Sequence, residues 1–119
     1  MIVTGALLAE SAAVVDNKLD IIGGVVDSAR ARPDRTVQAT LVVLIQPEPA
    51  DTAPTVDVRF SDPTGTAVDL ALAVPESSLG GEIGFVFYPL TLPVPVDGRY
   101  LMTVSGRGGF VSLPLRVLS

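Results

Sequence analysis

Residues 55–74 read TVDVRFSDPTGTAVDLALAV, and this stretch decides the fold. Up to Ser61 apolar and polar side chains alternate, which is the period of a β-strand with one buried face. The segment Asp62–Gly65 then forms a tight turn, because its proline presets φ and its glycine closes the turn. After the turn Val68, Leu70 and Leu72 repeat the alternation. The stretch therefore predicts an antiparallel hairpin whose apolar side faces a core.

Turn signals divide the rest of the chain into short runs in the same way. Short apolar runs are separated by Asp16-Asn17, Gly23-Gly24, Pro47-Glu48-Pro49 and Gly106–Gly109. This spacing is typical of sandwiches and barrels, and the frequent Gly and Pro would break most helices. We therefore predict an all-β fold, a two-sheet antiparallel sandwich with an immunoglobulin-like pattern and about eight strands.

The chain length predicts a single domain over residues 1–119. A chain of 119 residues is near the commonest domain size and can bury a core without disulfides. Aromatic residues make up only 5% of the sequence, so Val, Leu, Ile and Ala must build that core. The richness in Val favours strands over helices.

The missing residue types exclude several kinds of site. The sequence has no Cys and no His, so disulfides, thiolate metal sites, a Cys nucleophile and the commonest general base are all excluded. The one lysine, Lys18, lies in a turn sequence, which argues against a Ser–Lys pair. We predict no catalytic residue, no metal ligand and no cofactor, and we expect that the protein is not an enzyme.

Charge and hydropathy limit the possible partners. The net charge of −5 disfavours nucleic acid. The longest uncharged stretch, residues 83–96, contains three prolines and is shorter than the roughly 20 residues of a membrane span. The first positive charge is Lys18, so the early apolar stretch predicts a strand rather than a targeting segment. We expect a cytoplasmic protein, since the chain needs no oxidising compartment.

Two groups of charged residues leave an alternative open. Asp57 and Asp69 are predicted on one outer face, and a carboxylate pair is the minimum that glycoside hydrolysis requires. Solubilising charges are the simpler explanation of this pair. Likewise Arg30, Arg32 and Arg35 form either an ordinary solvated loop or a grip for an acidic partner.

Two stretches are apolar on both faces, residues 41–45 (LVVLI) and 85–90 (FVFYPL). In a sandwich the outer face of a strand normally meets water. With Phe85 and Phe87 placed inward, the outward apolar residues are Val42, Leu44, Val86, Tyr88 and Leu90. Either the Pro-rich stretch Thr91–Val96 covers them, or they form an interface with a subunit or partner. The assignment depends on strand parity, which a single bulge inverts.

Several stretches carry a family resemblance, namely Ala6-Leu7-Leu8-Ala9, Lys18–Gly24, Gly98-Arg99-Tyr100 and Leu113–Val117. With them the chain resembles a family of small bacterial proteins known only as a domain of unknown function. The resemblance implies a small β-sandwich and brings no activity or catalytic residue with it. The Gly-Arg-Tyr pattern also recurs in immunoglobulin-like domains, where the Tyr anchors a corner, and we expect this role for Tyr100.

The sequence thus favours a non-enzymatic module that acts through protein association, as a homo-oligomer or as a subunit of a larger assembly. A module that binds a small apolar ligand or a carbohydrate through its end loops is the first alternative. The scarcity of aromatic residues counts against carbohydrate stacking. An enzyme using Asp57 and Asp69 is the second alternative.

Overall fold

The computed structural model describes residues 1–119 and consists almost entirely of β-strands. One short 3-10 helix, η1 (Glu76–Leu79), precedes β8. The strands are β1 (Ile2–Ala9), β2 (Ser11–Val15), β3 (Lys18–Ile22), β4 (Ser28–Arg30), β5 (Thr36–Gln46), β6 (Thr55–Ser61), β7 (Ala67–Ala73), β8 (Gly84–Pro93), β9 (Gly98–Ser105) and β10 (Phe110–Leu118).

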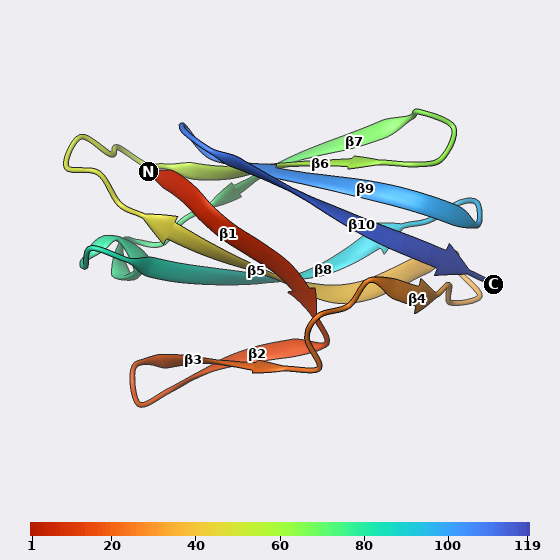
Figure 1. The fold of residues 1–119 in the computed structure, drawn as a ribbon, viewed down its shortest axis with the longest axis horizontal. Helices are drawn as coiled ribbons and strands as arrows, with labels where there is room; N and C mark the ends of the chain where they lie inside the picture. Colours follow the sequence, from red (N-terminus) through yellow and green to blue (C-terminus); the bar gives the residue numbers. More distant parts are fainter.

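These strands form a sandwich of two sheets, which confirms the predicted fold class (Figure 1). The smaller sheet has the order β1-β5-β8, and the larger sheet has the order β4-β10-β9-β6-β7. All pairs are antiparallel except β4 with β10. The strands number ten rather than about eight, because the first apolar stretch breaks at Glu10 and residues 28–30 add a short strand. The remaining pair, β2 and β3, forms a hairpin outside both sheets.

The sheet order agrees with the predicted immunoglobulin-like pattern. In that fold strands A, B and E share one sheet, while C, F and G share the other, with C′ beside C in variable-type domains. Here β1, β5 and β8 hold the places of A, B and E. The places of C, F, G and C′ are held by β6, β9, β10 and β7. The β2–β3 hairpin is an insertion after the first strand.

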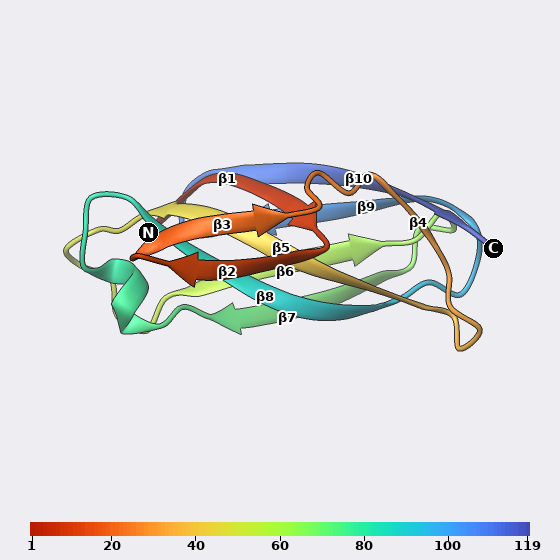
Figure 2. The same cartoon turned by 90° about the horizontal axis from the view of Figure 1, so that it is seen from below.

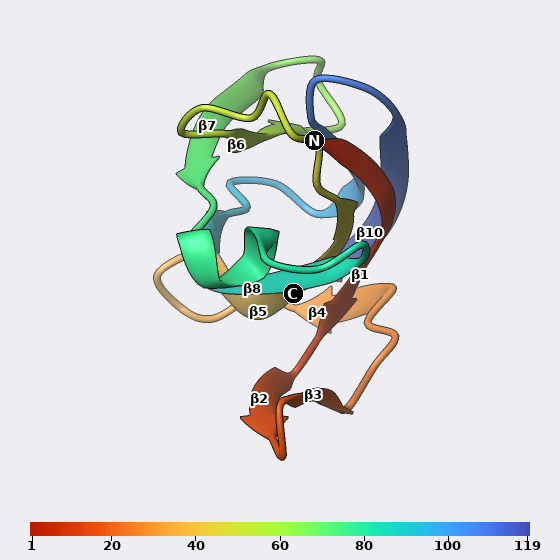
Figure 3. The same cartoon turned by 90° about the vertical axis from the view of Figure 1, so that its left-hand side faces the viewer.

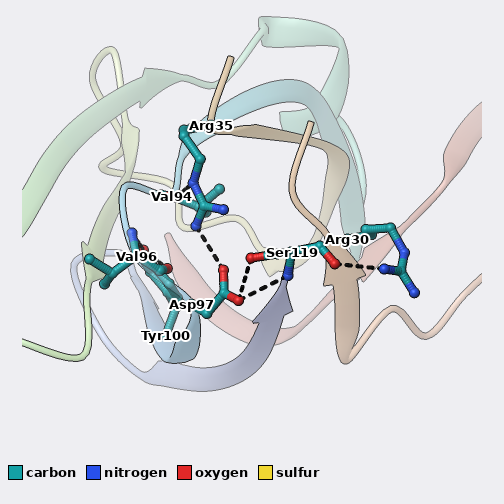
Figure 4. Close-up of polar contacts among 7 residues, drawn as sticks. All are labelled: Arg30, Arg35, Val94, Val96, Asp97, Tyr100 and Ser119. Carbon is teal, nitrogen blue, oxygen red and sulfur yellow. Dashed lines mark hydrogen bonds and ion pairs between the residues drawn. The ribbon is translucent and has the colours of Figure 1, made fainter. Parts of the chain in front are cut away.

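Tyr100 anchors the corner before β9, as predicted (Figure 4). Its ring is fully buried and stacks on Phe60, with ring centroids 5.0 Å apart. Its hydroxyl donates to the Val96 carbonyl oxygen at 2.7 Å and accepts from the Val96 amide nitrogen at 3.2 Å. The Tyr100 side chain therefore fixes the turn that leads from one sheet to the other.

The predicted hairpin of residues 55–74 is present as β6 and β7. The Asp62 carboxylate accepts hydrogen bonds from the backbone nitrogens of Thr64 (2.8 Å) and Thr66 (3.0 Å), which closes the turn. The apolar side chains of β6 are buried, and those of β7 lie on the same side. Val68 and Leu70 nevertheless remain exposed, because β7 is the last strand of its sheet.

The core lies between the sheets, and the two long sides of the sandwich differ (Figure 3). On one side β1 runs against β10, and the Val3 amide donates to the Gly108 carbonyl oxygen at 3.0 Å. On the other side β7 and β8 are bridged by the Tyr88 hydroxyl, which donates to the Ala73 carbonyl oxygen at 2.9 Å. Burial raises the pKa of Tyr88 to about 12, so this phenol stays a donor at neutral pH.

Candidate interaction surface

The outward side of the smaller sheet is apolar. β5 lies in its centre and pairs with both neighbours. Val42 is opposite Leu7 on one side and Phe87 on the other, and Leu44 is opposite Gly5 and Phe85. Residues directly opposite in an antiparallel pair share a face. We call this surface the outer apolar face, and it consists of Leu7, Val42, Leu44, Phe85 and Phe87.

The predicted outward direction of the side chains is right for β5 and wrong for β8. Val42 and Leu44 point outward as expected, because their neighbours Leu41, Val43 and Ile45 fill the core. The other predicted interface residues of β8 turn inward, and this corrects the assignment of Val86, Tyr88 and Leu90.

The physical reason for the error is that both parities of β8 begin with large apolar side chains. The signal that distinguishes them comes later in the strand. The alternate residues that share a face with Val86 stay apolar as far as Leu92. The alternate residues that share a face with Phe85 end in Pro89, Thr91 and Pro93. The outward set is therefore the one that becomes polar and Pro-rich.

The cover of this face is the β2–β3 hairpin, not the predicted stretch Thr91–Val96. Residues 91–93 belong to β8 itself, and Val94 is buried in the core. The hairpin lies below the smaller sheet in Figure 1 and in front of β5 in Figure 2, and β2 contacts β5. Its turn is Asp16-Asn17, and both residues have positive φ (51° and 61°), as a two-residue hairpin turn of type I′ requires.

One side of this hairpin is apolar throughout. Its pairing places Ala12 opposite Ile21 and Val14 opposite Leu19, and alternation puts all four on one side. The side chains of Ile21 and Leu7 both flank Gly24, where the chain returns to the sandwich. The apolar side of the hairpin therefore meets the outer apolar face at the β1 end.

The hairpin covers the face only in part. Val42 is 1% exposed, but Leu44 is 40% exposed and Val14 on the hairpin is 54% exposed. Between the hairpin and β8 a groove of about 510 Å³ remains, and Val14, Phe85 and Phe87 are among the residues that line it. Ile83 at its rim is 79% exposed. No charged side chain lines the groove, and Asn17, Ser77 and Ser78 lie in its wall beside the apolar residues, so it suits an uncharged surface rather than an ion.

The carboxylates Asp57 and Asp69 lie on one outer face of the larger sheet, as predicted. Asp69 is held by Arg59, whose Nε and Nη2 donate to its two oxygens at 2.9 and 3.2 Å. These hydrogen bonds from Arg59 lower the pKa of Asp69. A general acid needs a raised pKa, so Asp69 is poorly suited to act as the acid of a glycoside-hydrolysing pair. No group of three or more His, Cys, Asp or Glu side chains is placed to hold a metal ion.

Two of the three arginines of the predicted basic cluster, Arg30 and Arg35, are used within the chain (Figure 4). Arg30 donates to the Ser119 carbonyl oxygen at 2.6 Å. Arg35 donates to the Val94 carbonyl oxygen at 2.9 Å and to the Asp97 carboxylate at 3.0 Å. These side chains connect loops at one end of the sandwich, so they are not free to grip an acidic partner.

Two comparisons with known proteins give no evidence about function, so the functional argument depends on the surface described above. A scan against models of protein families found no match, and a search of curated proteins found none. The resemblance to a family of small bacterial β-sandwich proteins stays a prediction. The structure also contains no helix that is both long enough and apolar enough to cross a membrane.

Proposed function

We propose that this chain is a non-enzymatic β-sandwich module that assembles with other protein chains, first of all copies of itself, through the outer apolar face. The observation that carries the proposal is the uncharged groove between Val14 of the hairpin and Phe85 and Phe87 of β8. Exposed apolar side chains such as these mark association sites, because removing their surface from water contributes about 25 cal/mol per Å².

Three features support a role without catalysis. The sequence offers no His or Cys, its one lysine lies in the exposed hairpin, and Asp69 is occupied by Arg59. The net charge of −5 makes protein a better partner than nucleic acid. Because the chain has no cysteine to oxidise, we also propose that it works in the cytoplasm.

The proposal is tested by placing a charge on the face. Leu44→Glu would bury an unpaired carboxylate at any interface formed there, which costs several kcal/mol. We expect sedimentation velocity to show association of the wild-type protein and clearly weaker association of a folded Leu44→Glu variant at the same concentration. The matched control is Phe110→Glu, since Phe110 is 70% exposed at the start of β10 and lies outside the face.

Circular dichroism of both variants checks that they remain folded. Association of Leu44→Glu at the wild-type level would contradict the proposal, and so would an equal loss in Phe110→Glu.

A second candidate function is the binding of a small apolar ligand. The groove volume of about 510 Å³ falls within the range of about 300–1,000 Å³ that is usual for ligand sites. This groove lies beside β8, not among the end loops where the sequence placed the alternative. If it binds ligands, an apolar fluorescent dye should bind the Leu44→Glu variant and lose binding on further Val14→Glu substitution.

A further inference from the structure

The free edge of β7 is a second surface, separate from the outer apolar face. β7 pairs with β6 alone and is the last strand of the larger sheet (Figure 1). Val68 and Leu70 point to the core side but are 41% and 37% exposed. An edge strand also presents a row of backbone N–H and C=O groups, and on β7 only the Ala73 carbonyl oxygen already accepts a side-chain hydrogen bond, from the Tyr88 hydroxyl. β7 therefore offers both apolar side chains and free hydrogen-bonding groups.

The other edges of the two main sheets are protected. β8 carries Pro89 and Pro93, which remove donors for an added strand. β4 has only three residues, and β1 is held against the β9–β10 turn by the bond from Val3 to Gly108. Natural proteins use such devices to prevent edge-to-edge pairing. β7 has seven residues and contains neither proline nor lysine, so among the edges of the two main sheets it is the one left open to pairing.

We propose that β7 pairs with β7 of a second copy, antiparallel about a two-fold axis through Leu70. Such an interface must be self-complementary, and the strand sequence AVDLALA is nearly symmetric about its central residue. In this register Ala67 lies opposite Ala73, Val68 opposite Leu72, Asp69 opposite Ala71, and Leu70 opposite its own counterpart. Every pair on the core side is therefore apolar.

The charge carried by β7 is compatible with the register centred on Leu70. The one ionisable residue of β7, Asp69, faces an alanine instead of its counterpart, so no like charges stand directly opposite. Asp69 also keeps its own Arg59, at 2.9 Å on the neighbouring strand. On the core side the apolar row of Phe60 and Val68 continues into Leu72 and Val56 of the second copy. The pairing would join the larger sheets of the two copies into one continuous sheet and would leave no charge on β7 without its partner.

The size of the contact sets its expected strength. One seven-residue edge buries less than the roughly 1,200–2,000 Å² of a standard interface. We therefore expect a weak dimer that forms with rising concentration. The surface lies on the larger sheet, so this inference does not depend on the proposed function of the outer apolar face.

The absence of cysteine makes a sharp experiment possible, because a single introduced thiol has no competitor. Opposed residues in an antiparallel pair have Cα atoms about 4.5–5.5 Å apart, which a disulfide spans. We expect Leu70→Cys to form a covalent dimer under mild oxidation. Val68→Cys should cross-link with Leu72→Cys in a mixture much more than either does alone. All variants carry Leu44→Glu, so association through the outer apolar face is weakened equally in each of them.

The matched control is Phe110→Cys in the same background, a more exposed thiol outside β7. The proposal is overturned if Leu70→Cys yields no more covalent dimer than this control. It is also overturned if Val68→Cys links to itself as readily as to Leu72→Cys, since the register would then be wrong. Neither result bears on the outer apolar face, which the Leu44→Glu comparison tests.

Discussion

At the scale of single residues, Tyr100 shows how one side chain fixes the crossing between the sheets. It is fully buried, and its hydroxyl both donates to and accepts from the backbone of Val96. Nothing else in the structure is hydrogen-bonded to that phenol oxygen, so the corner depends on it. Loss of the hydroxyl leaves two backbone groups without their partner.

We expect Tyr100→Phe to lower the free energy of unfolding by about 1–3 kcal/mol, because it removes two part-buried hydrogen bonds that each contribute about 0.5–1.5 kcal/mol. Urea denaturation measures this change. Tyr88→Phe is the matched control, since it removes a hydroxyl from a half-exposed residue whose partner, the Ala73 carbonyl, water can reach. Equal losses in the two variants would show that the corner has no special role.

Asp62 makes the β6–β7 turn sensitive to pH. The Thr64 hydroxyl donates to its carboxylate at 2.6 Å, and this bond, with those from the backbone of Thr66 and Thr64, lowers the pKa of Asp62. A lowered pKa means that the charged form stabilises the fold above the unfolded value of about 3.9. That stability is lost as the pH falls through the folded pKa.

We therefore expect Asp62→Asn to melt below the wild-type protein at pH 7. The difference in melting temperature should shrink towards pH 3, because protonation removes the wild-type advantage. Thermal unfolding followed by circular dichroism at both pH values measures it. An unchanged or larger difference at pH 3 would contradict this account of the turn.

At the scale of elements, the sequence predicts strands well where one face is polar. The alternation around Asp57 and Arg59 places β6 and β7 and their core side correctly. The alternation fails for β8, because Phe85–Leu90 is apolar in both parities and local pattern then carries no information about the core side. Only the residues after Leu90 distinguish the two sides.

The β2–β3 hairpin marks a second limit of sequence reasoning. The turn at Asp16-Asn17 follows from residue types that tolerate positive φ. Its packing against the outer apolar face does not follow, because that contact joins Ile21 to Leu7 through the return at Gly24. The candidate surface was therefore only half predictable, through Val42 and Leu44 of β5.

We expect the sandwich to fold without this hairpin. Replacing Ser11–Ile22 by Asn-Gly would join Glu10 to Gly23, whose backbones already form a hydrogen bond of 3.2 Å. None of the replaced residues belongs to the buried core. The free energy of unfolding should therefore fall by about 1–3 kcal/mol, which is the contribution of burying one apolar side chain such as Val42. Urea denaturation measures it, and an unfolded variant would show that the hairpin is part of the cooperative core.

At the scale of the whole molecule, the two proposed surfaces lie on different sheets. The outer apolar face belongs to β1, β5 and β8, and the open edge belongs to β7. If both act between copies, each contact has its own two-fold axis, and the two together build a closed ring or an open chain. The net charge of −5 on each copy opposes such assembly, so apolar contact must supply the driving force.

The most direct test of the central claim, that this module assembles, is light scattering coupled to size-exclusion chromatography. The wild-type protein is measured at two well-separated concentrations and compared with its monomer mass of 12.3 kDa. We expect a mass above that value which increases with concentration, and a return towards the monomer in Leu44→Glu. A wild-type mass of one monomer at both concentrations would contradict assembly between copies through either surface.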